Sequence, residues 1–457
     1  MKSYPVNKYM ARYLLYLINY LKKCPITFKL FEFLRNNPLY KEILFLGSGT
    51  VVAQIIGIIS LPIITRLYSP SDLGVLAIFS SLLAIVGIGA TLRFEFAFLL
   101  PKEDREAINL FGLCLLILCI TTTLSATIFL YGDEILTTFN KDFGIIKPYI
   151  YFLPFGLMCM GLYTILNYWA IRQQDYKRIA HTTINRGLVC EVTKIVLGIL
   201  SYGPMGLIIG VILSQIAGIG TLSLNMWKKE RDNLKMISLS RMKQVAYIYR
   251  SFPIFNFPAS IVNTISIQIP LLMLLIIYDA RIAGLYTLAY TVVVLPGSII
   301  TNSMGQAYLG DVAKMIREKS PNILSFYLPH VKTPILFAIP IIGIPALCAP
   351  FVFPLIFGTA WVEAGFYCLP LAVMIIANFA FSPTSNLSTY GYNHWQLSWD
   401  LIRTSSLIGG FILAETINLS PIQTIIIYSF IMAIMYILLF FLNQAAINRI
   451  YWRFQNE

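Results

Sequence analysis

The sequence predicts an all-α polytopic membrane protein of about 12 transmembrane helices in two pseudo-symmetric six-helix bundles. Hydrophobic residues make up 57% of the 457 residues and charged residues only 12%, whereas a soluble domain carries roughly a quarter charged residues. A helix that crosses a bilayer needs ~20 mostly apolar residues. Twelve such runs lie near 43–65, 73–99, 107–131, 148–171, 179–200, 205–227, 252–277, 282–304, 333–356, 362–383, 397–414 and 421–442. They are too long, and alternate too little, for a transmembrane β-barrel.

The distribution of basic residues predicts that both termini are cytoplasmic. With the N-terminus inside and one crossing per run, most of the 34 Lys and Arg residues fall on the cytoplasmic side, many of them in 1–42 and 228–250. This asymmetry follows the positive-inside rule. It explains the net charge of +13 by topology and by anionic membrane lipids, so we expect no nucleic-acid partner.

An internal repeat divides the chain into two halves. The stretch from Tyr68 aligns without a gap with the stretch from Tyr278 at an offset of 210, and Arg186 aligns with Arg403 at an offset of 217. Six runs in each half give the halves the same orientation. This arrangement predicts a pseudo-two-fold axis along the membrane normal and alternating access around a central cavity.

The runs and the repeat together predict five segments. They are a basic cytoplasmic leader (1–42), an N-terminal six-helix bundle (43–227), a basic cytoplasmic linker (228–250), a C-terminal six-helix bundle (251–442) and a cytoplasmic tail (443–457). The leader mixes aromatic, leucine and lysine residues, which fits either an interfacial helix or a disordered basic tail.

Cysteine and histidine residues indicate neither disulfides nor a metal. No CxxC spacing occurs and the three histidines are far apart, so we expect no metal and no cofactor. Six of the seven cysteines lie in or beside apolar runs, where we expect small buried side chains: Cys114, Cys119, Cys159, Cys190, Cys348 and Cys368.

Charged side chains within the runs are the candidate functional residues, because charge at membrane depth costs ~2.5–3.5 kcal/mol on insertion scales and usually faces a cavity or a partner. In the run 179–200, Glu191 and Lys194 are three apart and can pair, whereas Arg186 lies on another side of the helix. In the run 397–414, Asp400 and Arg403 are again three apart and can pair.

Arg93 and Glu95 lie near the end of the run 73–99. They are two apart, so in a helix they point in different directions and we expect no pair between them. Snorkelling of both side chains to the interface is one interpretation.

These charges allow two interpretations. In the first, the acidic and basic residues form internal ion pairs that join helices. In the second, four basic side chains line a cavity that binds anionic cargo, since the guanidinium fork suits phosphate: Arg186, Arg403, Lys194 and Arg93. Three acidic side chains then serve in proton or Na⁺ coupling or in ion pairs: Glu191, Asp400 and Glu95.

Sequence motifs of several enzyme classes are absent. The chain has no G-x-x-x-x-G-K-[ST], HExxH or GxSxG sequence and no large extramembrane segment, and these motifs mark ATP hydrolysis, zinc proteolysis and serine hydrolysis. We therefore expect a transporter without covalent catalysis. A membrane glycosyltransferase or polymerase is the alternative from another class.

Residues 45–102 resemble the N-terminal module of Wzx-type O-antigen flippases. The resemblance rests on a Gly-rich first run, on P-x-x-x-R-x-Y-S-P-x-x-x-G from Pro62 to Gly74, and on R-x-E-x-A-x-L from Arg93 to Leu99. These flippases belong to the superfamily of multidrug, oligosaccharidyl-lipid and polysaccharide exporters.

The resemblance implies a V-shaped fold with a cationic central cavity, in the plasma (inner) membrane of a bacterium. It implies transport of an undecaprenyl-pyrophosphate-linked oligosaccharide, an O-antigen or capsule repeat unit, to the outer leaflet for polysaccharide biosynthesis. A polysaccharide polymerase and other assembly proteins are its candidate partners. A cation-coupled multidrug exporter of the same fold is the alternative within the superfamily.

Overall fold

The computed structural model describes residues 38–131, 144–317, 323–385, 387 and 390–456. The elements in these ranges are helices, with no strand among them. Each of the twelve predicted runs overlaps at least one helix there, which confirms the all-α fold class. Residues 1–37 of the predicted leader lie outside the described residues, as does segment 132–143.

The helices of the first half follow the order of the predicted runs. They are α3 (Pro38–Leu67), α4 (Pro70–Gly87), α5 (Asp104–Tyr131), α7 (Lys147–Ile150), α8 (Leu153–Arg172), α9 (Tyr176–Ile199) and α10 (Pro204–Leu234). A short helix, α11 (Leu239–Ile248), lies in the predicted linker.

The helices of the second half also follow the predicted order. They are α12 (Phe257–Ile277), α13 (Ala280–Arg317), α14 (Ile323–Ala338), α15 (Ile344–Ile356), α16 (Val362–Phe381), α17 (Asn393–Thr416) and α18 (Pro421–Asn456). The run 333–356 is therefore two helices, and a π-helical turn that contains Pro340, Ile339–Gly343, lies between them.

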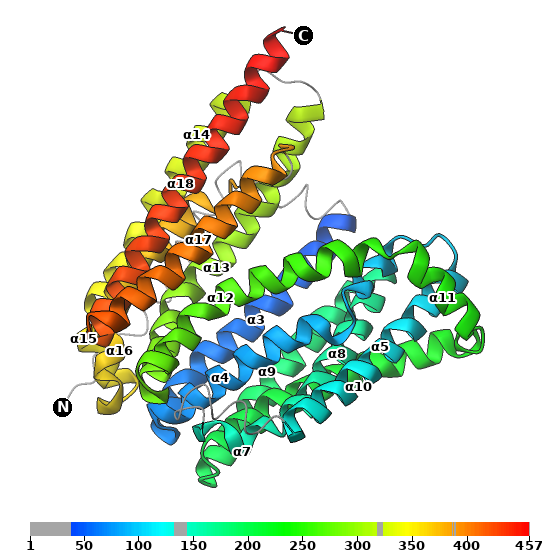
Figure 1. Ribbon diagram of the computed structural model, residues 1–457, viewed down its shortest axis with the longest axis horizontal. Helices are drawn as coiled ribbons and strands as arrows, with labels where there is room; N and C mark the ends of the chain where they lie inside the picture. Colours follow the sequence, from blue (N-terminus) through cyan, green and yellow to red (C-terminus); the bar gives the residue numbers. More distant parts are fainter. Residues whose placement is uncertain (1–37, 132–143, 318–322, 386, 388–389, 457) are drawn as a thin grey trace, which may run out of the picture.

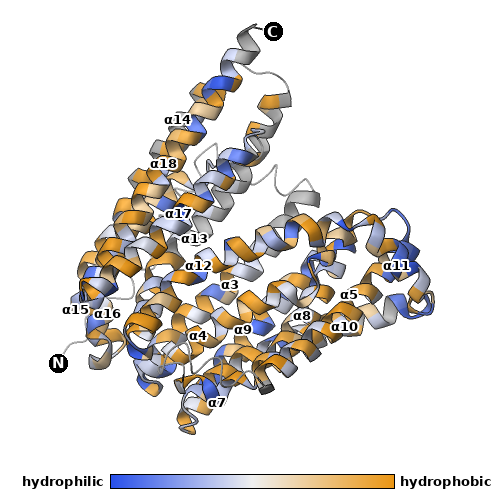
Figure 2. Cartoon of the chain, viewed as in Figure 1, coloured by the Kyte–Doolittle hydropathy of each residue, from blue (hydrophilic) through white to orange (hydrophobic). Residues whose placement is uncertain are grey.

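The surface of the described chain is that of a multi-pass membrane protein. Eight of its helices are long and apolar enough to cross a bilayer. The helices α9 and α17 are not among them, because charged and polar side chains interrupt their apolar sequence. Large apolar side chains remain exposed on outward faces, as at Ile59, Ile120 and Ile434. Figure 2 shows these apolar surfaces, and it shows α11 as a hydrophilic element.

The helices form two groups that diverge in a V (Figure 1). One group contains α3–α10 and the other contains α13–α18, and α12 lies between them. We call the two groups the N-lobe and the C-lobe. The predicted segment boundaries stay a prediction.

The lobes meet where α4 and α13 begin, and they approach there at backbone distance. A Cβ atom added to Gly74 would lie 1.8 Å from the carbonyl oxygen of Ala280, and one added to Gly284 would lie 1.8 Å from that of Pro70. The offset of 210 relates Gly74 to Gly284 and Pro70 to Ala280. The contact is therefore symmetric, and small residues allow it, as in small-xxx-small crossings of membrane helices.

A buried tryptophan adds a second connection at this end of the molecule. Trp361, which is fully buried, donates a hydrogen bond of 2.8 Å from Nε1 to the backbone carbonyl of Thr65 at the end of α3. Further along the junction, the hydroxyl of Ser81 lies 3.2 Å from Oε1 of Gln268 on α12. These contacts hold the lobes together near one end, while the other ends diverge.

The motif after Pro62 has a direct structural role. Ser69 caps α4, because its hydroxyl accepts a hydrogen bond from the backbone NH of Asp72 and the carboxylate of Asp72 accepts from the backbone NH of Ser69. This reciprocal capping box fixes the start of the helix. Tyr68 donates a 2.7 Å hydrogen bond to the carbonyl of Lys194 and so fastens the end of α3 to α9.

Two sequence-based expectations were wrong in detail. The run 73–99 is not one helix, because α4 ends at Gly87 and two 3₁₀ segments follow, Ile88–Ala90 and Phe94–Leu99. Two of the six cysteines are exposed rather than buried, namely Cys119 and Cys348, and Cys190 is of intermediate exposure. Cys119 and Cys348 are exposed because, within the described residues, no helix covers their faces of α5 and α15. The six form no disulfide within the described chain.

Candidate functional site: an arginine-lined cavity

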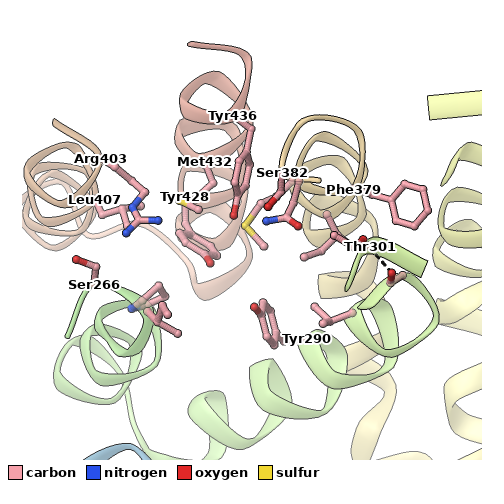
Figure 3. Close-up of a pocket in the computed structure, with 17 residues that line it drawn as sticks. Ser266, Tyr290, Thr301, Phe379, Ser382, Arg403, Leu407, Tyr428, Met432 and Tyr436 are labelled. Atoms are coloured by element: carbon pink, nitrogen blue, oxygen red, sulfur yellow. Dashed lines mark hydrogen bonds between the residues drawn. The ribbon is translucent and has the colours of Figure 1, made fainter. Parts of the chain in front are cut away.

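A cavity lined by Arg403 lies between the C-lobe and α12, and we call it the C-lobe cavity. It has a volume of about 240 Å³. Five helices line it: α12, α13, α16, α17 and α18. In Figure 3 the side chains of Arg403, Tyr428, Tyr436, Tyr290 and Ser266 point toward one shared space. A charged group within a polar bundle interior in the membrane indicates a functional site.

The position of Arg403 at the cavity wall is fixed by contacts on its own helix. Its Nη2 lies 3.1 Å from Oδ1 of Asp400, which confirms the predicted pair, and its guanidinium lies over the ring of Trp399 at 4.6 Å. The side chain is 11% exposed. Nε and Nη2 nevertheless have no hydrogen-bond partner within the described chain, since the approach to Asp400 lacks hydrogen-bond geometry.

Hydroxyl and amide groups make up the rest of the polar lining. Ser266 on α12 shares a 2.7 Å hydrogen bond with Thr404, which holds α12 against α17. Tyr290 and Asn378 reach the cavity from α13 and α16. Such groups both donate and accept hydrogen bonds, so the cavity suits a ligand with several oxygens.

Arg186 in the N-lobe has a matching position and a different environment. It is the eleventh residue of the 24-residue helix α9, as Arg403 is of the 24-residue helix α17. Its Nη2 donates a 2.9 Å hydrogen bond to Oε1 of Gln215, and its guanidinium lies 3.8 Å from the centre of the Tyr163 ring. Its partners in these contacts are neutral, so they leave its positive charge in place.

Glu191 and Lys194 form the predicted pair on the same helix. Nζ of Lys194 lies 2.9 Å from Oε1 of Glu191, and Ser60 on α3 donates a 2.8 Å hydrogen bond to the other carboxylate oxygen. Both side chains are largely buried. The pair therefore joins α9 to α3, and its charges largely cancel.

Arg93 and Glu95 do form a pair, contrary to the prediction. Nη1 of Arg93 lies 3.5 Å from Oε1 of Glu95. The prediction assumed a continuous helix, but Leu92 and Arg93 have positive φ angles of 50° and 66°, a left-handed conformation that redirects their side chains. Thr91 donates a hydrogen bond to the buried carboxylate of Glu95 as well.

The structure divides the predicted site residues into separate environments. Arg403 and Asp400 lie at the C-lobe cavity, Arg186 lies among N-lobe side chains, and Glu191 pairs with Lys194 at the α3–α9 contact. The sequence analysis missed the cavity residues Tyr428, Met432 and Tyr436. Their spacing of four on α18 places them on one face, and that spacing was the available signal. No cluster suited to a metal ion occurs within the described residues.

Comparison of the sequence with known families identifies one match. Residues 63–365 match the family described as "Polysaccharide biosynthesis protein", which is more than half of the chain. Among curated proteins, none matches this sequence.

Solved structures with the same fold are transporters. The inward-facing form of a multidrug resistance MATE family transporter of the MOP superfamily has a TM-score of 0.72 at 15% identity, covering 87% of this chain and 95% of that one. The lipid II flippase MurJ in an inward closed conformation has a TM-score of 0.65 at 14% identity, with 90% and 91% covered.

A MOP superfamily transporter from Pyrococcus furiosus, described as having a binding pocket of reverse polarity, has a TM-score of 0.61 at 16% identity, with 91% and 97% covered. At such identities these likenesses establish the fold, and they support the resemblance seen in residues 45–102. The family match settles the affiliation: this chain belongs to the family of polysaccharide biosynthesis proteins within the fold of the MOP transporters.

Proposed function

We propose that the protein is a flippase for a lipid-linked oligosaccharide. It moves an undecaprenyl-pyrophosphate-linked O-antigen or capsule repeat unit from the cytoplasmic to the outer leaflet of the bacterial inner membrane. Transport proceeds by alternating access between the two lobes, without covalent catalysis. In this proposal both termini are cytoplasmic and the basic segments 1–42 and 228–250 contact anionic lipids.

The matched arginines are the observation that carries the proposal. Arg186 and Arg403 occupy the same place on repeat-related helices of the two lobes. A symmetric movement of the lobes would therefore displace both arginines in the same way. Guanidinium groups bind phosphate oxygens in pairs. A diphosphate-bearing cargo is the ligand in polysaccharide biosynthesis that such groups suit, and the fold shared with a lipid II flippase supports cargo of this class.

The contacts of the four proposed basic residues differ in how much capacity they leave for binding an anion. Arg186 has neutral partners and Arg403 has nitrogens without hydrogen bonds, so both have capacity to bind an anion. Lys194 and Arg93 lie in ion pairs with Glu191 and Glu95, so they bind cargo only after those pairs open. Opening of these two pairs, and of the pair between Asp400 and Arg403, is how Glu191, Glu95 and Asp400 would couple transport to protons or Na⁺.

Gene deletion tests the function directly. Lipid-linked repeat units should accumulate on the cytoplasmic leaflet and surface polysaccharide should disappear. Normal surface polymer in the deletion strain would reject the proposal. A polymerase mutant differs because it exports single units, whereas a flippase mutant exports none.

Complementation of this strain tests the arginines. Arg186→Ala and Arg403→Ala should each fail to restore surface polysaccharide while reaching the membrane in normal amounts. Arg105→Ala is the matched control, because Arg105 is exposed near the start of α5 and outside the basic segments, and it should restore polymer fully. Full restoration by both arginine variants would make the arginines structural.

A cation-coupled multidrug exporter is the second candidate, favoured by the likeness to a MATE family transporter. A cavity that binds cationic drugs needs acidic groups, and the arginine in the C-lobe cavity opposes this. Overproduction should therefore leave resistance to cationic drugs unchanged. A clear rise in resistance that depends on Asp400 would favour the exporter.

A further inference from the structure

The cavity around Arg403 has a counterpart in the N-lobe that the chain itself fills. The helices α9 and α17 begin and end at an offset of 217, and α10 and α18 begin at Pro204 and Pro421, again 217 apart. This offset relates Gln215 on α10 to Met432 on α18. The repeat therefore places Met432 where the N-lobe has the partner of its arginine.

In the N-lobe, the chain supplies its own acceptor. Oε1 of Gln215 accepts a 2.9 Å hydrogen bond from Nη2 of Arg186, and the Tyr163 ring covers the guanidinium. Gly218 closes the space further, because a Cβ added there would lie 2.6 Å from Tyr163 and 2.8 Å from Cδ of Arg186. Nη2 of Arg186 thus has a neutral acceptor within the chain at close packing, while Nε of Arg186 has no hydrogen-bond partner within the described residues.

In the C-lobe, α18 supplies no acceptor at the equivalent position, and Nη2 of Arg403 has only the 3.1 Å ion pair with Asp400 on its own helix. A methionine sulfur is at best a weak acceptor, and Nη2 and Nε of Arg403 have no hydrogen-bond partner in the described chain. In place of the filled packing there is a cavity of about 240 Å³, which Met432 and Arg403 both line. Buried donors without partners are costly, so the arrangement favours an acceptor from outside the chain.

We propose that the C-lobe cavity is a binding site for an oxyanion, a carboxylate or a phosphate group. One oxygen of this group accepts a hydrogen bond from Arg403, as Oε1 of Gln215 accepts one from Arg186. The hydroxyls of Tyr290 and Tyr428 line the same cavity and supply further donors. Asp400 does not preclude this, because a guanidinium has five N–H donors and Asp400 also accepts from Gln396 at 3.1 Å.

The oxyanion has two sources that share this chemistry. One is an acidic group of the cargo, namely its diphosphate or a uronic acid, and this source rests on the proposed function. The other is a free inorganic anion that enters the C-lobe independently of the cargo. The site itself is argued only from the contacts of Arg403 and from the repeat.

Binding to the purified full-length protein in a phosphate-free detergent tests the site. Titration calorimetry with inorganic phosphate and with glucuronate, at constant ionic strength, should detect binding of at least one of them. Arg403→Gln should abolish it. Met432→Gln should weaken it by roughly tenfold to a hundredfold, because the new amide occupies Arg403 as Gln215 occupies Arg186.

The matched control is Ile434→Gln, which adds the same amide to an outward face of α18 at a residue 58% exposed. It should bind as the wild type does. The thermal midpoints of all variants without ligand show whether the fold persists, and Arg403→Gln remains decisive if Met432→Gln fails to fold. Absence of binding to the wild type, or undiminished binding to Met432→Gln or to Arg403→Gln, would overturn the proposal.

Competition separates the two sources. Undecaprenyl diphosphate that displaces inorganic phosphate identifies the cargo's acidic group as the ligand, and absence of displacement identifies a free anion; both results require the site. If binding is present and the deletion strain still makes normal polysaccharide, the proposed function fails and the site stands. If binding is absent and the strain lacks polysaccharide, the site fails and the function stands.

Discussion

The close contact between the lobes predicts that one methyl group added at Gly74 lowers the stability of the protein. In Gly74→Ala the new Cβ would lie 1.8 Å from the carbonyl oxygen of Ala280, whereas comfortable contact needs about 3.5 Å. The obstacle is backbone on both sides, so α4 and α13 must separate by roughly 1.5 Å. Overpacking of this kind costs about 1–3 kcal/mol, and we expect a clear fall in the thermal midpoint of the purified protein.

Two other glycine substitutions are the controls for this prediction, one at the repeat-related position and one in open space. Gly284→Ala should have an effect of similar size, because its Cβ meets the carbonyl of Pro70 at the same 1.8 Å. Gly57→Ala, with no atom within 4 Å of the new Cβ, should be neutral or stabilising by up to ~1 kcal/mol through helix propensity. Equal midpoints for Gly74→Ala, Gly57→Ala and the wild type would refute the close-contact reasoning.

Two further substitutions test the buried polar contacts. Trp361→Phe removes the donor to the Thr65 carbonyl and should lower stability by about 1–3 kcal/mol, measured as thermal unfolding; an unchanged midpoint would show that this bond does not hold the lobes together. Glu191→Gln leaves Lys194 buried without its counter-charge and should destabilise by about 3–5 kcal/mol. The double variant with Lys194→Met should recover much of this loss, and additive losses would argue against a buried pair.

The sequence was sufficient to predict the helices and the repeat. Apolar runs of bilayer length have few structural alternatives, because the membrane requires every backbone group to be satisfied within the protein. The offset of 217 also placed Arg186 and Arg403 on equivalent turns of equivalent helices, as α9 and α17 confirm. Pairs three residues apart on a helix were equally predictable, as at Glu191–Lys194 and Asp400–Arg403.

Departures from regular helix were beyond the sequence analysis. The run 73–99 is apolar apart from Arg93, Glu95 and a few small polar residues, yet Leu92 and Arg93 adopt left-handed conformations that bring Arg93 to Glu95. Hydropathy carries no signal for such a backbone change. The spacing rule for helices therefore gave the wrong result at the one pair that does not lie in a regular helix.

The cavity could not be predicted from the sequence either, because its lining residues come from five helices spread along the chain from Ser266 to Tyr436. Met432 has no functional signature of its own. Its significance appears only when the lobes are superposed through the repeat and Gln215 is seen at the equivalent place. The sequence alone gives the offset that relates Gln215 to Met432. The contacts of Arg186 and Arg403 are needed to show that Gln215 is an acceptor for arginine and that Met432 is not.

Transport by the purified protein in vesicles tests the central claim most directly. Reconstituted wild-type protein should move an undecaprenyl-diphosphate-linked repeat unit between leaflets, measured by its accessibility to an external sugar-modifying enzyme. Arg403→Ala should reduce this movement to the level of protein-free vesicles, while Arg105→Ala should not. Movement by Arg403→Ala at the wild-type rate, or no movement by the wild-type protein, would contradict the account.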